Sequence, residues 1–558
     1  MRFGRLAAAA RPVRRALVLR GAALVALTVA LGARAIDSDV YEGGEAREAL
    51  VAREMLDTGD WILPLWNGSV VPSKPPLFHW LVTGASRLAG GQVTERTLRA
   101  PSVVLAGAVV LLVFLAGLAW GGADVGTFAA LVLATTPQFL TEASDGRVDM
   151  TLTAALTGAQ VALVQALGAR RGARLVLAVC LALAMLAKGP VGPGVVGLTA
   201  LAFAACERRL RPILGLVRPL PVLLFVALAG GWYGLAYAHR GMDFVAKQIL
   251  SENGEALLGS SRFPYRSPLY YVGPLVLGGL PWTLVVPWAA ARAWRGELPR
   301  RYALVWAATV WIFFSLAPLK RAAYLLPLRP ALALVVGWWL AEVTREEQPA
   351  TRLVGAARTL VVAVAAGGVL AAVTALAVGH GLVSAAGIRD VALRHEIDAE
   401  AYRRALTAQQ AEIVGLALAT AVAAGLAARA LARERWRHAT LATAGATACV
   451  AILVLEVFVP ARAAQKSVRP FALAVRERLG PTEPLSLLAV DEEIPFIFYV
   501  GRHVPLASGR PGELGAGYYV LDQQRWRAWG RPFGWEEVLR SAHVFSRHRR
   551  DLVLVRRR

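Results

Sequence analysis

The sequence predicts a polytopic α-helical membrane protein with about 13 transmembrane helices and a small external α/β domain at its C-terminus. The composition points there first, because 56% of the 558 residues are hydrophobic and 18% are charged, against about 25% charged in soluble domains. The mean hydropathy is +0.50. Many apolar runs also reach the length of about 20 residues that a bilayer core requires, and short arginine-rich loops separate them.

The apolar runs give the positions of the expected spans. They lie at roughly 14–33, 100–120, 124–142, 150–168, 172–187, 191–206, 219–238, 268–291, 302–318, 322–342, 355–379, 411–431 and 439–460. The first run has the basic start and small-residue end of a signal peptide, but the many spans that follow favour an uncleaved first helix. A multi-pass membrane protein is therefore expected.

The arginines predict the orientation of these spans, because cytoplasmic loops of membrane proteins are enriched in Lys and Arg. With a cytoplasmic N-terminus, the inner loops receive Arg170, Arg171, Arg174, Arg208, Arg209, Arg211, Arg292, Arg295, Arg300, Arg301, Arg345, Arg352, Arg429, Arg433, Arg435 and Arg437. The long loops at about 34–99, 239–267 and 380–410 are then external, as is everything after about 461. The net charge of +23 accordingly indicates membrane anchoring, and no nucleic-acid partner is expected.

The C-terminal part differs in composition, and we divide the chain into a transmembrane domain at 1–462 and an external domain at 463–558. Three short apolar runs, LSLLAV, YYVLD and DLVLV, predict buried strands. Stretches such as WEEVLRSA between them are interpreted as helical.

Charged and polar side chains gather on the predicted external face. They are Asp37, Asp39, Glu42, Glu45, Arg47, Lys74, Asp145, Arg147, Asp149, Lys188, Glu252, Arg262, Arg266, Lys320, Arg321 and Tyr324. Ionisable groups at span ends are costly unless they are paired or line a cavity. We therefore expect a cavity at the membrane surface, with cations that suit an anionic head group and carboxylates that suit acid–base chemistry.

Individual residues also have simpler interpretations. Lys74 could extend along the membrane interface, Asp149 could cap the helix that follows it, and Arg262 and Arg266 could be ordinary loop residues. Lys320 and Arg321 break the positive-inside pattern, which favours a role beyond anchoring. Asn67-Gly68-Ser69 has the form of a glycosylation sequon, although a turn is favoured.

Several motifs, in order along the chain, resemble one family. They are EAREALVAREMLDTGDWILPLWNGSVVPSKPPLFHWL, GRVDMTLTAAL, LAKGPVG, PLYYVGPLVLGGLPW and FFSLAPLKRAAYLLPLRPALAL. Together they resemble the bacterial ArnT-like, protein O-mannosyltransferase-related membrane glycosyltransferases of the GT-C fold, and the similarity covers most of the membrane region.

The resemblance implies an inverting transfer of a sugar from a polyprenyl-phosphate donor to a lipid, glycan or protein acceptor outside the cytoplasmic membrane. It implies that the donor phosphate is bound by Arg47, Lys74, Lys320 or Arg321, and Tyr324, to which we add Arg262 and Arg266 from the loop at 239–267. Asp149 would organise the site or bind the acceptor. No cofactor and no metal ion are expected.

One departure from the family pattern concerns the catalytic base. The family has an Asp-Glu pair before the Arg, and the Asp is its favoured base; this chain has Gly44 there, with Glu45 and Arg47 at the next two motif positions and Glu48 in place of a Tyr. We predict Glu45 as the base, with Asp39 and Glu42 as alternatives. Ser73 and Asn253 replace the Glu and His of the aminoarabinose transferases. Both differences argue against aminoarabinose as the sugar and against a metal bound as in that subgroup. A non-catalytic lipid-phosphate-binding relative and a lipid or sugar transporter stay open.

Overall fold

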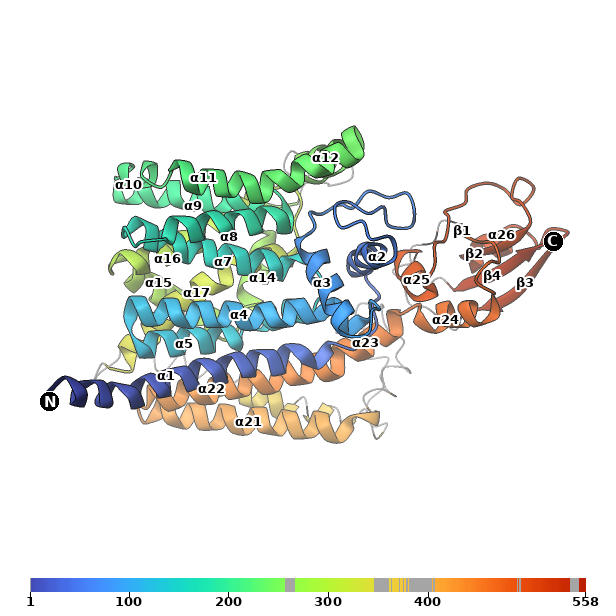
Figure 1. The fold of residues 1–558 in the computed structure, drawn as a ribbon. Coiled ribbons are helices and arrows are strands. Elements are labelled where there is room, and N and C mark those ends of the chain that lie inside the picture. Colours follow the sequence, from blue (N-terminus) through green and yellow to red (C-terminus); the bar gives the residue numbers. More distant parts are fainter. Residues whose placement is uncertain are drawn as a thin grey trace.

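The long helices lie side by side along a common axis, and a smaller unit with a β-sheet projects from one end of this bundle (Figure 1). The structure is a computed structural model and describes residues 2–255, 266–345, 361–380, 404, 407–541 and 551–558, apart from 363, 371, 375, 378, 379, 489, 491 and 492. The N-terminus lies at the end of the bundle opposite the sheet (Figure 1).

The bundle consists of α-helices that differ widely in length. They are α1 (Arg2–Gly32), α4 (Glu95–Gly121), α5 (Ala123–Ala134), α6 (Pro137–Ala143), α7 (Val148–Leu167), α8 (Ala173–Lys188), α9 (Val191–Glu207), α10 (Arg211–Leu214), α11 (Pro219–Phe225), α12 (Gly231–Phe244), α14 (Val272–Leu277), α15 (Val286–Trp294), α16 (Leu298–Leu316), α17 (Arg329–Val343), α21 (Gln410–Ala432), α22 (Trp436–Ile452) and α23 (Val459–Lys466). Helices α2 (Gly43–Thr58) and α3 (Leu77–Leu88) lie beyond the bundle, between α4 and the sheet unit (Figure 1).

Within the described residues, seven helices are long and apolar enough to cross a membrane, or eight if one bent pair counts as a single span. The chain is therefore a multi-pass membrane protein. The predicted span at 124–142 is in fact two helices, α5 and α6, which separate just before Pro137. The predicted span at 268–291 is a pair of helices, Pro268–Leu277 and Trp282–Trp294, bent by 111°.

Both breaks have the same physical reason. Proline lacks the backbone N–H that a continuing helix needs, and glycine lowers helix stability; Gly278, Gly279 and Pro281 lie within the second break. The start of the predicted span at 355–379 and most of the loop at 380–410 lie outside the described residues.

Several of the predicted cytoplasmic arginines meet at the end of the bundle away from the sheet. Arg301 pairs with Glu207 at 3.1 Å, and Arg345 and Arg437 both reach Asp124, at 3.3 and 3.5 Å. Loops that are far apart in sequence but share the basic pattern therefore lie on one side of the bundle.

The C-terminal unit consists of helices α24 (Arg469–Arg478), α25 (Glu493–Val500) and α26 (Gln523–Ala528) with four strands. The strands are β1 (Leu485–Leu487), β2 (Gly517–Asp522), β3 (Trp535–Arg540) and β4 (Leu552–Arg557), in the sheet order β1-β2-β4-β3. Strands β1 and β2 are parallel, and the other two pairs are antiparallel.

The three predicted strands are confirmed, but the helical interpretation of WEEVLRSA is wrong, because this stretch contains β3. Pairing with β4, in which Trp535 lies opposite Arg557, outweighs the helix propensity of its Glu, Leu and Arg residues. The sequence alone could not show that this stretch pairs with β4.

One hydrophobic cluster joins α2 and α3 to the C-terminal unit. It contains Ala46 and Phe78 on the one side and Phe496, Ile497 and Leu554 on the other, all buried. The shared core fixes α2 between the bundle and the sheet, and α2 carries Gly44, Arg47 and Glu48.

A polar lock adds to this apolar contact. Asn67, in a turn with φ of 50°, donates from its amide nitrogen to the carbonyl of Val504 at 3.0 Å and accepts from the N–H of Val504 at 2.9 Å. Arg53 of α2 also donates to the carbonyls of Phe498 and Ile497 at the end of α25. The sequon-like Asn67 is thus buried in a turn, where it holds the C-terminal unit.

We expect Asn67→Ala to loosen this lock, because it leaves two backbone groups of the buried Val504 without partners, at a cost of about 1–3 kcal/mol. Hydrogen–deuterium exchange of residues 497–507, followed by mass spectrometry, should speed up. The matched control is Ser69→Ala in the same turn, where the side chain is exposed. Equal exchange in wild type and Asn67→Ala would contradict the assigned role.

Candidate functional site

A cavity of about 370 Å³ lies where the ends of α7, α8 and α16 meet α2 and the loop before α3. It is lined by Gly44, Arg47, Glu48, Ser73, Lys74, Arg147, Val148, Asp149, Lys188, Pro190, Val191, Gly194, Glu252, Asn253, Phe313, Phe314, Ala317, Leu319, Arg321 and Tyr324. Five of these side chains are cationic and three are carboxylates, so the lining carries an excess of positive charge. The expected polar cavity therefore exists, at the end of the bundle that faces the sheet.

Lys74 follows the turn of the first long loop and enters the cavity just before Pro75 and Pro76. Its Nζ lies 3.0 Å from Oε2 of Glu252, and its backbone carbonyl accepts from Gln248 at 3.0 Å. Because the two prolines restrict the backbone that follows, the lysine is held at the cavity edge and not left free along an interface. Glu252 belongs to a π-helical segment, Val245–Glu255.

Asp149 lies in the first turn of α7, so it was open to interpretation as a helix cap. Its Oδ1 instead pairs with Nζ of Lys188, the last residue of α8, at 2.5 Å. Lys188 also lies 4.2 Å from the centre of the Tyr324 ring. Three elements that are distant in sequence thus meet here, and Asp149 fixes the position of a cavity cation.

Arg147 occupies the space beside Gly44. A Cβ atom at Gly44 would lie 2.9 Å from Nη2 of Arg147, so the missing side chain makes room for the guanidinium. Arg147 contacts Glu42 at 3.4 Å and Asp145 at 4.0 Å. Burial lowers its pKa, but Asp145, Asp149 and Glu42 raise it more; Arg147 is therefore a permanent cation of the cavity.

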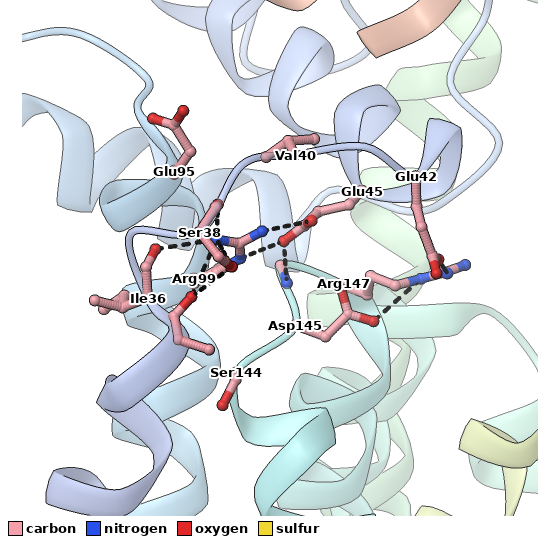
Figure 2. A network of polar contacts seen from close by, with 12 residues as sticks. Ile36, Ser38, Val40, Glu42, Glu45, Glu95, Arg99, Ser144, Asp145 and Arg147 are labelled. Carbon is pink, nitrogen blue, oxygen red and sulfur yellow. Dashed lines mark hydrogen bonds and ion pairs between the residues drawn. The ribbon is translucent and has the colours of Figure 1, made fainter. Parts of the chain in front are cut away.

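Glu45 does not line the cavity, and both of its carboxylate oxygens bind Arg99 of α4. Figure 2 shows both carboxylate oxygens facing the guanidinium, at 2.7 and 2.9 Å. The N–H of Gly146 also donates to Glu45 at 2.9 Å, and Arg99 donates to the carbonyls of Ile36 and Ser38. Glu45 and Arg99 therefore brace the first loop against α4; the catalytic role predicted for Glu45 is not supported by these contacts.

The other predicted residues divide clearly. Arg47, Lys74, Asp149, Arg321 and Tyr324 line the cavity, whereas Asp39, Glu42, Glu45, Arg266 and Lys320 do not.

Contacts away from the cavity explain those exclusions. Asp39 pairs with Arg469 at 2.8 Å, and Arg266 is exposed and lies over the ring of Tyr270 at 5.7 Å. Lys320, 2% exposed, donates to the carbonyls of Ser315 and Ala317 at the end of α16. Arg262 lies outside the described residues.

Prediction missed Glu48 as a site residue. Its Oε2 accepts a hydrogen bond from Nε2 of His79 at 2.5 Å, and His79 lies in the first turn of α3. Burial raises the pKa of Glu48, but the hydrogen bond and charge of His79, with Lys74 and Arg47, lower it on balance. The spacing along α2 could have predicted Glu48, because it follows Gly44 by one helical turn and therefore lies on the same face of the helix.

Lys188 and Glu252 were counted among the external charges but were given no role in the site. A cavity role was not evident because their partners, Asp149 and Lys74, come from other segments of the chain. Within the described part of the chain, no three His, Cys, Asp or Glu residues are arranged to hold a metal ion.

The bracing role of Glu45 predicts a stability effect. We expect Glu45→Gln to lower the free energy of unfolding by about 3–5 kcal/mol, because it leaves Arg99 buried without a counter-charge. The readout is the thermal unfolding midpoint of the detergent-purified protein. Glu42→Gln is the control, since Glu42 is 51% exposed and its ion pair is longer; equal midpoints for the two variants would contradict the assignment.

Comparison with known proteins finds a matching family model and similar sequences. The sequence profile of the family described as dolichyl-phosphate-mannose-protein mannosyltransferase matches residues 73–231. The undecaprenyl phosphate-alpha-4-amino-4-deoxy-L-arabinose arabinosyl transferase of Serratia proteamaculans is 27% identical over 307 residues, which cover 53% of this chain and 54% of that protein. The transferase of the same name from Edwardsiella ictaluri is 27% identical over 368 residues, or 63% and 65% of the two chains. The matched regions thus span between about half and two thirds of these relatives.

Solved structures show the same fold over nearly the whole chain. The crystal structure of ArnT from Cupriavidus metallidurans bound to undecaprenyl phosphate matches with a TM-score of 0.77 and 19% identity, covering 96% of this chain and 97% of that one. Its apo form matches with a TM-score of 0.75 and 20% identity, covering 97% and 98%. The resemblance found in the motifs is therefore confirmed: this chain has the GT-C fold and is similar to the ArnT-like, protein-mannosyltransferase-related membrane glycosyltransferases.

Proposed function

We propose that the protein is an inverting glycosyltransferase that moves a sugar from a polyprenyl-phosphate donor to a lipid, glycan or protein acceptor at the outer face of the cytoplasmic membrane. One observation carries the proposal: a cavity with five cationic and three carboxylate side chains opens at one end of an apolar helical bundle. Such a lining suits a phosphate group carried by a lipid.

The reaction needs little beyond positioning and charge stabilisation. An acceptor oxygen attacks the anomeric carbon while the bond from that carbon to the donor phosphate breaks. Negative charge grows on the leaving phosphate, and fixed cations placed around it lower the barrier. Lys74, Arg321 and Arg147 supply that charge, and Asp149 holds Lys188 beside them.

The apolar part of the cavity suits the lipid chain of the donor. Val191, Phe313 and Phe314 form its wall on the side of α9 and α16. The relatives named above are arabinosyl transferases that act on an undecaprenyl phosphate sugar, and the matching ArnT crystal structure holds undecaprenyl phosphate. These names support the donor class. Ser73, Asn253 and Gly44 depart from the family pattern, so the sugar and the acceptor must be determined by experiment.

The proposal includes an orientation. We place the N-terminus and the arginine-rich end of the bundle in the cytoplasm, and the cavity with the C-terminal unit outside. Thirteen spans, a transmembrane domain at 1–462 and an external domain at 463–558 are part of this arrangement. The ion pairs of Arg301, Arg345 and Arg437 at the opposite end support it.

Mass spectrometry of envelope lipids and glycans, from cells with and without the gene, tests the activity. A mass difference of one sugar would support it and would identify both the sugar and the acceptor. No difference in cells that contain the protein would overturn it, and retained binding of undecaprenyl phosphate would then indicate a non-catalytic lipid-phosphate-binding protein.

Lys74→Ala should weaken binding of undecaprenyl phosphate by about 10- to 100-fold, because a charge-assisted hydrogen bond is worth about 1.5–3 kcal/mol. Binding can be measured with the detergent-purified protein by native mass spectrometry. Lys247→Ala is the matched control, since Lys247 pairs with the other oxygen of Glu252 at 3.4 Å but does not line the cavity. Equal loss in both variants would contradict a direct role for Lys74.

A further inference from the structure

Resting on the proposed function, we infer that Glu48 is the residue that takes the proton from an acceptor hydroxyl, and that His79 positions it. The inference changes the expected base from Glu45 to a residue in the cavity. It also specifies the acceptor class, because a hydroxyl needs a proton acceptor, whereas an ionised phosphate does not.

The three carboxylates that line the cavity differ in their partners. Asp149 is held by Lys188 at 2.5 Å. Glu252 is held between Lys74 at 3.0 Å and Lys247 at 3.4 Å, with one of its oxygens toward each. Asp149 and Glu252 therefore both form ion pairs with lysine ammonium groups.

Glu48 has a different partner. In the described part of the chain its hydrogen bond is made by Oε2 alone, to His79, and imidazole is the side chain that changes charge most readily near neutral pH. A carboxylate paired with imidazole can gain a proton without breaking up a cation set that binds phosphate. Glu48 is therefore the lining carboxylate best suited to proton transfer.

His79 is held firmly enough to act as a positioning residue. It is 1% exposed and lies in the first turn of α3, directly after the prolines that follow Lys74. The edge of the neighbouring Phe78 ring lies beside it, with ring centres 6.4 Å apart. The lowered pKa of Glu48 keeps the carboxylate ionised at neutral pH, which a proton acceptor requires.

The geometry of α2 explains why the role falls at this position. Gly44 and Glu48 are one helical turn apart, and both line the cavity. The space beside Gly44 is taken by Arg147, whose Nη2 would lie 2.9 Å from an added Cβ. On this face of α2, the cavity carboxylate is therefore at position 48.

Glu48 takes up the proton while the sugar passes to the acceptor. The acceptor oxygen forms its bond to the anomeric carbon as its proton passes to the carboxylate of Glu48. The bond from the anomeric carbon to the phosphate oxygen breaks, and the polyprenyl phosphate leaves with the electron pair, beside Lys74 and Arg321. No oxidant, reductant or further reactant is needed.

The test separates proton transfer from all other roles of Glu48. Membranes of cells that lack the chromosomal gene and express wild type or Glu48→Gln supply the endogenous lipid-linked donor. Azide is added as a substitute nucleophile, because it is already an anion and gives up no proton. We expect Glu48→Gln to lower sugar transfer to the native acceptor by at least about 100-fold, while formation of the glycosyl azide stays within about threefold of wild type.

The outcomes distinguish the two proposals. Transfer by Glu48→Gln at the wild-type level, or loss of the azide product together with the native product, would overturn the role of Glu48. Neither product from the wild-type protein would overturn the proposed function itself. Glu54→Gln is the matched control, since Glu54 lies on the same helix but does not line the cavity; both of its reactions should equal those of wild type.

His79→Leu tests the positioning role. It should lower transfer to the native acceptor but spare the azide reaction, and His79→Gln, which restores a donor near the position of Nε2, should recover part of the transfer. Full transfer by His79→Leu, or parallel loss of both reactions, would overturn the role of His79.

Discussion

The arrangement depends on pairing the charges that the fold buries at one end of an apolar bundle. An ionised side chain removed from water costs several kcal/mol unless a partner compensates it. Arg99 is 4% and Glu45 6% exposed in their side chains, and Lys188 and Asp149 are nearly as buried. These pairs allow charged groups to stay buried at the end of the bundle that faces the sheet. There they surround a cavity with excess positive charge.

Two kinds of carboxylate result from this constraint. Glu45 and Asp149 neutralise single cations and thereby set the positions of α2, α4, α7 and α8. Glu48 is paired with an imidazole, and among the described residues no arginine or lysine forms an ion pair with it. Electrostatic interactions are stronger in this low-dielectric setting than in water. They hold Glu45 and Asp149 in structural ion pairs, and they also strengthen the interaction of Glu48 with charge that develops during proton transfer.

The C-terminal unit takes part in this arrangement through α2. One face of α2 packs into the shared core with Phe496 and Ile497, and another carries Gly44, Arg47 and Glu48 to the cavity. Asn67 and Arg53 hold the same interface with hydrogen bonds. The C-terminal unit therefore sets the position of a cavity wall, although none of its described residues lines the cavity.

The sequence predicted the helical membrane architecture well, because apolar length is a local property. It missed the breaks before Pro137 and at Gly278–Pro281, although the residues that cause them were visible, and it assigned β3 as a helix because a six-residue strand depends on its partner. About half of the predicted site residues line the cavity, among them Lys74, Asp149 and Tyr324, whereas Glu48 was missed. The roles of individual residues were harder to predict, because they depend on which side chains meet in the fold. The pairs Lys74–Glu252, Glu45–Arg99 and Glu48–His79 join residues 178, 54 and 31 positions apart, and a single sequence does not show such pairs.

The central claim is that the cationic cavity binds the phosphate of a polyprenyl lipid. An experimental structure of the protein with undecaprenyl phosphate, determined in a lipid nanodisc by electron cryomicroscopy, tests it most directly. The account predicts phosphate density within hydrogen-bonding distance of Lys74 and beside Arg321, with the lipid chain running along Phe313 and Phe314. Phosphate density elsewhere, for example in the tryptophan-lined cavity at Trp282, Trp288 and Trp436, with the cationic cavity empty, would contradict it.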